Sequence, residues 1–218
     1  MTDDEVIRQF RGLYSGKLAQ NRRAAGIPDH LAMPPWAETY WLGKQVVKGP
    51  MDLWVSQEII FETRPEVLLE TGTSGGGSAF FFATLFDILG RGAVITVDKD
   101  EYPHLWREHP RITYLVGDSV SDVIAQRMRA DSEGRVTMVS LDSLHTREHV
   151  AKELAVYAPF VSAGQYLVVE DVAQGIHDGD LTWGSGAALA FMNAQPAFVR
   201  DATREKHLMT SNLWLRRV

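Results

Sequence analysis

Three carboxylates stand where apolar, strand-like runs of the chain end, which makes them the first candidates for chemistry. Asp142 follows the run VTMVSL (136–141), and Glu170 and Asp171 follow the run QYLVV (165–169). Short β-branched runs are typical of strands buried on both faces of a parallel sheet, and such sheets bind ligands outside the carboxyl ends of their strands. One predicted helix separates the two runs, so Asp142 and Glu170 are expected to be neighbours at one edge of the sheet.

Carboxylates gathered in this way need a cation. They raise one another's pKa unless a positive charge neutralises them, and oxygen-only ligands favour a hard ion such as Mg²⁺, Mn²⁺ or Ca²⁺. We therefore expect Asp142, Glu170 and Asp171 to form a divalent-metal site. The alternative is a metal-free site in which one or two of these acids cap helices or bind a ribose.

A histidine follows closely behind the first of these acids. His145 comes three residues after Asp142, in a loop before a helix for which Thr146 is the expected N-cap. A neutral imidazole can accept the proton of a substrate hydroxyl, more readily once a metal has acidified that hydroxyl. We interpret His145 as the candidate general base, with a purely hydrogen-bonded histidine as the alternative. Packing is the expected role of His149, because no H-E-x-x-H motif is present.

A glycine-rich segment forms a second candidate site. In VLLETGTSGGGSAFFF (67–82) a strand-like run leads through Glu70 into a loop and then a helix, so that backbone N–H groups and a helix N-terminus face a ligand. The spacing does not match the dinucleotide motif G-x-G-x-x-G. Glu70 would repel a pyrophosphate but suits an amino group, such as that of the methionine part of S-adenosylmethionine. We expect Glu70, Gly72, Thr73 and Ser78 to contact this cofactor.

Two further strand ends carry acids that suit the rest of such a cofactor. Asp98 ends the run AVITVD, where a carboxylate can accept hydrogen bonds from ribose hydroxyls. Asp118 and Ser119 follow the run ITYLV, where an acid beside a small hydroxyl residue can receive an adenine amino group. We also expect Asp142 to contact the cofactor. The alternative for each strand-end acid is plain turn chemistry.

The elements that must position these residues alternate regularly from Asp52 onward. A helix over 52–62 with Asp52 as N-cap leads to a strand over 67–70 and a helix over 78–89 that ends at Gly90. Further strands are expected at 93–98, 112–116, 136–141 and 165–169, helices near 120–130, 146–158 and 186–194, and two strands at the end. This alternation predicts an α/β fold with a mostly parallel sheet and helices on both faces.

We divide the chain into an N-terminal helical or loop cap over residues 1–50, without strand-like runs, and one domain over residues 51–218. The aromatic residues Trp36, Tyr40, Trp41 and Trp54 could line a substrate pocket under the cap, or simply pack in the core. The loop over 172–184 could close over such a pocket.

Composition narrows the class of protein. The 218 residues are 45% hydrophobic and 23% charged, as in an ordinary globular protein, and the net charge of −6 disfavours nucleic-acid binding. The absence of cysteine excludes disulfides, thiolate zinc sites, iron–sulfur clusters and cysteine nucleophiles. The longest apolar segment, AFFFATLFDIL, is too short to cross a bilayer, and MTDDEVIRQF lacks the basic start of a secretory signal. We expect a soluble, cytoplasmic protein with neither membrane nor nucleic acid as partner.

Several motifs together resemble one family. They are KGPMD (48–52), QEIIFE (57–62), ETGTSGGGS (70–78), HPRITYLVGDS (109–119), LDSLHTREHV (141–150), APFVSAGQYLVVED (158–171), GSGAALAFM (184–192) and DATREKHLMTSN (201–212). In these motifs the chain resembles the cephalosporin hydroxylase-like family, which consists of S-adenosylmethionine-dependent O-methyltransferases and their relatives.

The resemblance implies a class I methyltransferase fold, with a seven-stranded sheet whose last strand is antiparallel. It implies that Asp142, Glu170 and Asp171 bind magnesium and that His145 is the base, as in similar macrolide sugar O-methyltransferases. It also supports a cofactor site formed by Glu70, Gly72, Ser78, Asp98, Asp118 and Ser119. One departure is Leu144, where the family often has Asp or Asn. A homo-oligomer is expected as well.

The resulting hypothesis is methyl transfer from S-adenosylmethionine to a hydroxyl of a small natural-product or sugar-type substrate, with Mg²⁺ or Mn²⁺ bound. Two alternatives stay open. A metal-dependent hydroxylase, suggested by the family's name, would need two histidines and one carboxylate around iron. A non-catalytic subunit would bind the cofactor without transferring its methyl group.

Overall fold

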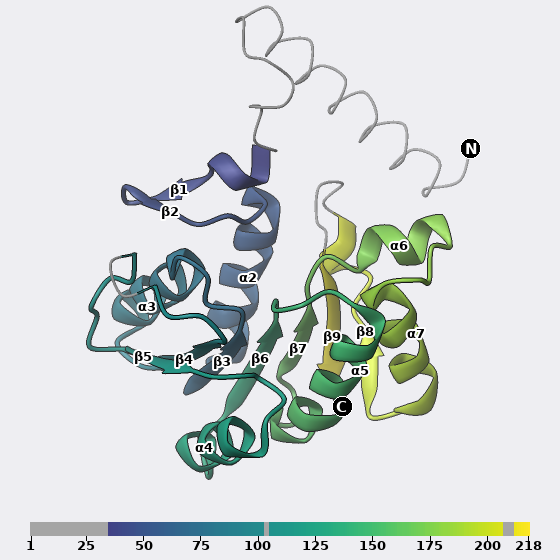
Figure 1. Ribbon diagram of the computed structural model, residues 1–218. Helices are drawn as coiled ribbons and strands as arrows, with labels where there is room; N and C mark the ends of the chain where they lie inside the picture. Colours follow the sequence, from purple (N-terminus) through teal and green to yellow (C-terminus); the bar gives the residue numbers. More distant parts are fainter. Residues whose placement is uncertain (1–34, 103–104, 207–211) are drawn as a thin grey trace, which may run out of the picture.

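The apolar runs pair into one seven-stranded sheet. The computed structural model describes residues 35–102, 105–206 and 212–218, and the strand order is β5-β4-β3-β6-β7-β9-β8 (Figure 1). The strands are β3 (Val67–Thr71), β4 (Ala93–Asp98), β5 (Ile112–Val116), β6 (Thr137–Leu141), β7 (Tyr166–Val169), β8 (Phe198–Arg200) and β9 (Leu213–Arg217). Strands β3 to β7 pair in parallel, whereas β9 runs antiparallel to β7 and β8. The predicted fold class is confirmed.

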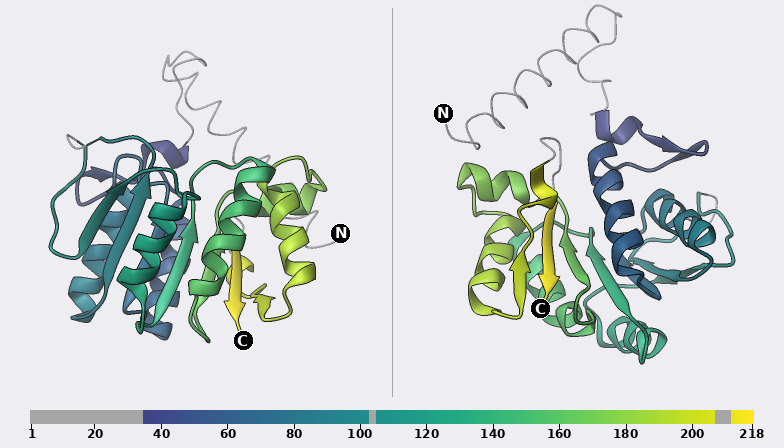
Figure 2. Two further views of the ribbon diagram at one scale, coloured as in Figure 1. Left: turned by 60° about the horizontal axis from the view of Figure 1, so that its bottom comes forward. Right: turned by 180° about the vertical axis from the view of Figure 1, so that it is seen from behind.

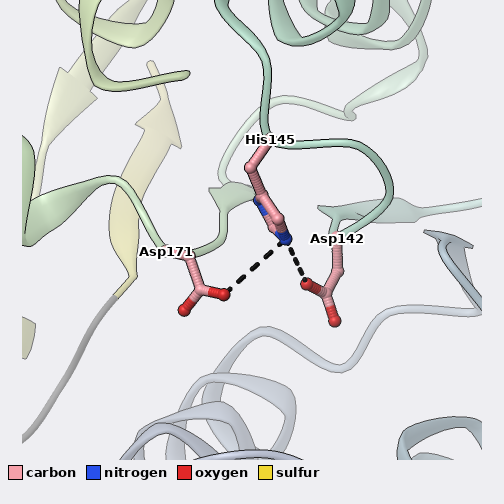
Figure 3. A group of neighbouring side chains, drawn as sticks. All are labelled: Asp142, His145 and Asp171. Carbon is pink, nitrogen blue, oxygen red and sulfur yellow. Dashed lines mark ion pairs between the residues drawn. The ribbon is translucent and has the colours of Figure 1, made fainter. Parts of the chain in front are cut away.

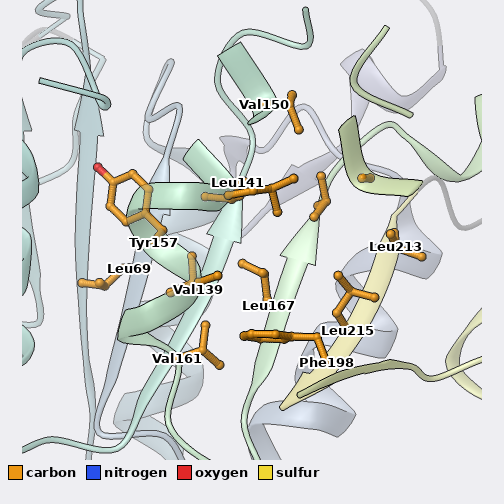
Figure 4. Close-up of a cluster of buried hydrophobic side chains, with 14 of the residues drawn as sticks. Leu69, Val139, Leu141, Val150, Tyr157, Val161, Leu167, Phe198, Leu213 and Leu215 are labelled. Carbon is orange, nitrogen blue, oxygen red and sulfur yellow. The ribbon is translucent and has the colours of Figure 1, made fainter. Parts of the chain in front are cut away.

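Helices cover both faces of the sheet. Figure 2 shows α2 (Pro50–Thr63) and α3 (Gly77–Leu89) on one face. On the other lie α4 (Asp122–Ser132), α5 (Arg147–Tyr157) and α7 (Gly184–Ala194). Alternate residues of each strand face opposite layers, so Leu68 packs with α2 and α3 while Leu69 packs with α4 and α5. Figure 4 shows the second of these clusters, in which Leu69, Val139 and Leu167 from three neighbouring strands pack together.

Most helix ends match the predictions, and one does not. The Thr146 side chain caps α5 by accepting a hydrogen bond from the backbone N–H of His149, and Gly90 ends α3 in the left-handed conformation at φ 69°. Asp52, predicted as the N-cap of α2, lies instead buried within its first turn, and the N-cap is Gly49. Pro50 explains the difference, because its fixed φ suits the first helical position and its missing N–H is not needed there.

The region predicted to lack strands contains a small hairpin. A 3₁₀ turn, η2 (Pro35–Glu38), precedes β1 (Tyr40–Trp41) and β2 (Lys44–Gln45), which pair in antiparallel fashion. Trp41 ties this hairpin to α3, since its Nε1 donates to Thr84 Oγ1 at 2.8 Å and its ring packs against Phe81. Trp41 is therefore a packing residue, as the alternative held. Residues 1–34, most of the predicted cap, lie outside the described residues, and the domain division stays a prediction.

The remaining elements are short. They are η3 (Ala158–Phe160), η4 (Arg204–Lys206) and α6 (Ala173–Asp178), the last within the segment expected to be a loop. Among the described helices, none combines the length and the apolar character that crossing a bilayer would require.

Candidate active site

The two predicted acid positions meet at the carboxyl edge of the sheet. In the β6–β7 ladder Leu141 lies beside Val169, and pairing continues one residue further, where the Glu170 N–H donates to the Leu141 carbonyl at 3.0 Å. On the other side of β6, the Asp142 N–H donates to the Thr71 carbonyl at 3.0 Å. The expected proximity of Asp142 and Glu170 is confirmed, and backbone hydrogen bonds fix both positions.

Three side chains converge at this edge and could hold a metal ion. His145 Nε2 lies 3.5 Å from Asp142 Oδ1 and 3.6 Å from Asp171 Oδ2, and one ligand atom from each residue falls within 4.8 Å of the others (Figure 3). Asp171 is exposed and has a positive φ of 58°, a conformation that is uncommon for non-glycine residues. Two carboxylates and one imidazole offer suitable atoms for a divalent ion.

Glu170 is held apart from this group. Its Oε1 accepts a hydrogen bond from Ser140 Oγ at 2.6 Å, and its Oε2 accepts one from Lys48 Nζ at 2.5 Å. The same ammonium lies 2.6 Å from Asp142 Oδ2. Thus Asp142 and Asp171 converge on His145, whereas the third predicted ligand faces Lys48. The ligand set Asp142, Glu170 and Asp171 stays a prediction.

Lys48 is the residue that sequence reasoning missed as a functional group. Burial alone would lower the pKa of Lys48, but the negative charges of Asp142 and Glu170 raise it well above the usual value, so the ammonium stays charged. Burial and the neighbouring Glu170 raise the pKa of Asp142, against the opposing effect of Lys48. The available signal was the position of Lys48 within the KGPMD motif, which carries part of the family resemblance.

The glycine-rich segment forms a turn between β3 and α3. Glu70 is fully buried, and its Oε2 accepts a hydrogen bond from Thr96 Oγ1 at 2.7 Å. Burial raises the pKa of Glu70, although Lys48, Ser78 and Thr96 lower it. Within the described residues Glu70 Oε1 meets no hydrogen-bond partner, which fits a carboxylate that awaits a donor. The first turn of α3 has no side-chain cap, so its N–H groups are available to an anionic group.

The other residues predicted in this segment have structural contacts of their own. A Cβ on Gly72, where φ is +87°, would lie 1.9 Å from the Asp142 carbonyl oxygen, so only glycine allows the loop to approach β6 this closely. The Thr73 hydroxyl lies 2.6 Å from Thr96 Oγ1 and joins the hydrogen-bonded chain that leads to Glu70. Ser78 is buried in the first turn of α3.

An aromatic stack covers the loop, and this too was not predicted. The rings of Trp106 and Tyr114 are stacked with centroids 4.7 Å apart, and Trp106 Nε1 donates to the Ser74 carbonyl at 2.8 Å. A Cβ on Gly76 would lie 3.2 Å from Trp106, so the stack contacts the loop directly. Burial and the charge of Glu70 raise the pKa of Tyr114 to about 12.

The acids at the next two strand ends accept hydrogen bonds from backbone N–H groups. Asp98 accepts hydrogen bonds from the backbone N–H groups of Ser74 at 2.7 Å and Asp100 at 3.1 Å. Asp118 accepts one from the N–H of Val120 at 3.1 Å. The contacts with Asp100 and Val120 match the turn alternative, whereas the contact with Ser74 joins Asp98 to the glycine loop. The predicted roles of Asp98 and Asp118 in cofactor binding stay predictions.

Ser119 belongs to a buried polar network. Its hydroxyl donates to Glu153 Oε1 at 2.7 Å, as does the hydroxyl of Ser143, and Glu153 is almost fully buried on α5. His149 Nε2 lies 3.2 Å from Ser119 Oγ and 3.0 Å from Ser143 Oγ. The network links the end of β5 to the loop after β6. In it His149 has a structural role, in keeping with the predicted packing.

Comparisons with known proteins bear on this geometry. The sequence model of the family described as "Rhamnosyl O-methyltransferase/CmcI" matches residues 34–218. The "Rhamnosyl O-methyltransferase" of Mycobacterium leprae (strain TN) is 33% identical over 182 residues, which cover 78% of this chain and 78% of that protein. The protein of the same name from Mycobacterium tuberculosis (strain ATCC 25618 / H37Rv) is 36% identical over 143 residues, which cover 62% of this chain. The match spans 58% of the length of that relative.

Solved structures show the same fold. The structure "cmcI-D160 Mg-SAM" superposes with a TM-score of 0.67 at 21% identity, covering 90% of this chain and 83% of that one. The structure "MycE Methyltransferase from the Mycinamycin Biosynthetic Pathway in Complex with Mg and SAH, Crystal form 1" superposes with a TM-score of 0.56 at 18% identity, covering 75% and 48%.

Proposed function

Because the chain belongs to the Rhamnosyl O-methyltransferase/CmcI family, we propose that it is a divalent-metal-dependent O-methyltransferase. It would transfer the methyl group of S-adenosylmethionine to a hydroxyl of a small sugar-type or natural-product acceptor. The observation that carries the proposal is the convergence of Asp142, His145 and Asp171 at the carboxyl edge of the sheet. This group lies next to the glycine loop, since Gly72 packs against the backbone of Asp142.

The cofactor would bind across the ends of β3, β4 and β5. Glu70 offers a buried carboxylate oxygen with no hydrogen-bond partner among the described residues, which suits the amino group of the cofactor. Ser78 and the uncapped first turn of α3 suit its carboxylate. The contacts of Gly72, Thr73, Asp98, Asp118, Ser119 and Asp142 with the cofactor are part of the proposal.

Asp142 and Asp171 would hold Mg²⁺ or Mn²⁺, completed by Glu170, and His145 would stay free to act as the base. The carboxylates point toward a common position on the His145 side, which supports this assignment. When bound, the ion would neutralise the acids and lower the pKa of a substrate hydroxyl.

His145 would remove the proton of the acceptor hydroxyl. The acceptor oxygen would bond to the methyl carbon as the bond from that carbon to the sulfonium sulfur breaks, its electron pair going to sulfur, and the proton would pass to the His145 imidazole. The carboxylates of Asp142 and Asp171 beside Nε2 would stabilise the imidazolium that forms. General-base help of this kind contributes about 10²–10⁴-fold, and orientation of the two reactants can supply roughly 7–11 kcal/mol.

Two exposed apolar residues, Trp183 and Leu144, lie close to His145 along the backbone and would suit a ring-shaped acceptor. Trp183 is 61% exposed and pairs with Thr146 through an isolated bridge, while the Gly184 N–H donates to the His145 carbonyl at 2.9 Å. Leu144, where the family often has a polar residue, is 57% exposed on the other side of His145 in the chain. Exposed apolar surface next to a polar site suits the carbon face of a pyranose.

Calorimetry and a methyl-transfer assay test this function. S-Adenosylhomocysteine should bind the wild-type protein, Mg²⁺ should bind the wild-type protein but not Asp142→Ala, and a panel of sugars with vicinal hydroxyls should be screened as acceptors. His145→Ala should bind S-adenosylhomocysteine normally while turnover falls by about 10²–10⁴-fold. Full activity in a chelator would remove the metal from the mechanism, and unchanged turnover in His145→Ala would remove the base.

Cofactor binding without transfer to any acceptor would instead support a non-catalytic subunit. Self-association is also part of the proposal, and light scattering tests it.

A further inference from the structure

Lys48 occupies the side of the acid cluster that faces away from His145. Its side chain is 6% exposed, and its Nζ lies 2.6 Å from Asp142 Oδ2 and 2.5 Å from Glu170 Oε2. The second oxygen of Glu170 is bound by Ser140, so both oxygens of this carboxylate are engaged within the protein. Lys48, Asp142 and Glu170 therefore form an ion-pair cluster without a metal ion, in which Lys48 and Glu170 are buried and Asp142 is partly buried.

The backbone around Lys48 is fixed in a way that directs its side chain inward. One threonine holds both polar backbone groups of Lys48, since Thr39 Oγ1 donates to the Lys48 carbonyl at 2.9 Å and lies 3.4 Å from the Lys48 N–H. The preceding residue, Val47, has φ 59°, which is costly for a β-branched side chain and persists only where surrounding contacts impose it. A Cβ on Gly77 would lie 2.0 Å from the Gln45 carbonyl oxygen, so α3 packs tightly against this segment.

Asp142 stands between two positive positions. Its Oδ2 accepts from Lys48, and its Oδ1 faces His145 and the position proposed for the metal. Glu170 lies outside the group of ligand atoms around His145, and its two oxygens already accept hydrogen bonds from Ser140 and Lys48. The Lys48 ammonium that touches Glu170 Oε2 repels a divalent ion that approaches this oxygen. As long as the Lys48 ammonium stays in place, Glu170 is not available to a metal ion that Asp142 and Asp171 bind.

We propose that Lys48 is an internal cation that neutralises Asp142 and Glu170 when no metal is bound, and that a divalent ion can recruit Glu170 only by displacing the Lys48 ammonium. Lys48 would thus be a positioning residue that competes with the metal and sets its affinity. The inference rests on the metal dependence of the proposed function. It goes beyond that function by naming the competitor and the carboxylate over which the two cations compete.

The proposal predicts that a variant without the ammonium is less stable in the absence of metal and binds Mg²⁺ more tightly than the native protein. Lys48→Met keeps the aliphatic stem but leaves the buried Glu170 and the partly buried Asp142 without their cation, so its melting temperature in EDTA should fall by about 10 °C. Apparent affinity for Mg²⁺ is reduced in proportion to the fraction of molecules whose Glu170 is free to bind it. Removal of the ammonium frees Glu170 in all molecules and should therefore tighten Mg²⁺ binding by roughly tenfold or more. Lys48→Arg should bind Mg²⁺ no more tightly than the wild type, because its fork pairs with carboxylates even more firmly.

The experiment is a Mg²⁺ titration by calorimetry, with melting curves in EDTA and in Mg²⁺, on the full chain. Two further variants serve as controls. Lys152→Met removes a lysine from an exposed pair with Glu148 and should change the melting temperature by no more than about 3 °C and Mg²⁺ affinity not at all. Lys48→Met combined with Glu170→Gln removes both charges, and should recover stability in EDTA while losing the gain in affinity.

Each outcome decides between the possibilities. If Lys48→Met and the double variant both bind Mg²⁺ no more tightly than the wild type, Lys48 does not compete with the metal. That outcome would overturn the inference and leave the proposed metal site intact. No Mg²⁺ binding by any protein in the set would overturn the metal part of the proposed function and the inference with it. If Lys48→Met does not fold in EDTA, the Lys48→Arg titration still decides, because tighter binding than in the wild type would contradict displacement.

Discussion

Gly72→Ala should damage the metal site from the loop that follows the neighbouring strand β3. The ideal Cβ at Gly72 would lie 1.9 Å from the Asp142 carbonyl oxygen and 2.5 Å from its carbonyl carbon, both of them backbone atoms. Contacts of a real Cβ essentially never fall below 3.0 Å, so the peptide that carries Asp142 must move. The shift needed is about 1 Å, and a misplacement of that size near reacting groups can cost on the order of 10²-fold in rate.

The loss of stability has two parts. An L-residue at φ +87° costs about 1–2 kcal/mol, and overpacking adds typically 1–3 kcal/mol. For a chain of this size each kcal/mol lowers the melting temperature by about 2–4 °C. We therefore expect Gly72→Ala to melt roughly 5–20 °C below the wild type and to bind Mg²⁺ more weakly.

Gly90→Ala is the matched control. Gly90 has a similar φ of +69°, but a Cβ there would meet nothing within 4 Å, so only the backbone part applies. Its melting temperature should fall by about 2–8 °C, with unchanged affinity for Mg²⁺ and S-adenosylhomocysteine. Melting curves measure the two losses of stability, and calorimetry at a temperature where both variants are folded measures their affinities for Mg²⁺ and S-adenosylhomocysteine. Equal losses in the two variants, with Mg²⁺ affinity unchanged in both, would refute the contact between Gly72 and Asp142 as a determinant of the site.

Two further predictions concern the supports of the site. Trp106→Ala removes the hydrogen-bond donor to the Ser74 carbonyl and the ring that stacks on Tyr114 over the glycine loop. S-Adenosylhomocysteine should therefore bind about tenfold more weakly, while the melting temperature changes little. Equal affinity in calorimetry would show that this ring is dispensable for cofactor binding. Glu153→Ala leaves the hydroxyls of Ser119 and Ser143 without their buried acceptor, and should cost about 1–3 kcal/mol in the free energy of unfolding measured with urea; a smaller loss would mean that the network is solvated.

The elements that position the acids could be predicted because their signals are local. The run AVITVD coincides with β4, Thr146 caps α5, and Gly90 ends α3, since period, cap and glycine each act over a few residues. The proximity of Asp142 and Glu170 followed from one topological rule, that a helix between two parallel strands brings their carboxyl ends to the same edge. The same reasoning chose the wrong cap for α2, because an aspartate in the first turn and a proline at the first helical position both favour a helix start.

Contacts between distant segments could not be predicted in this way. Lys48 lies 94 residues from Asp142 and 122 residues from Glu170 in the chain, and it reaches both only after α2 and the preceding hairpin have packed against the sheet. Ser119 shows the same limit, because the acid that binds its hydroxyl comes from α5, 34 residues further on. A strand-end residue can be placed from the sequence, but the direction its side chain takes depends on partners from other elements.

Lys48 is a source of positive charge that the sequence did not reveal. Carboxylates gathered at one edge need such a charge, and we assigned that need to a metal alone. The chain supplies one cation itself, in contact with Asp142 and Glu170, and leaves Asp142 Oδ1 and Asp171 facing His145. A protein with this arrangement can keep its acids buried without a metal, because a paired buried charge avoids the penalty of an unpaired one. Its affinity for a divalent ion then depends on how readily the Lys48 ammonium gives up Glu170.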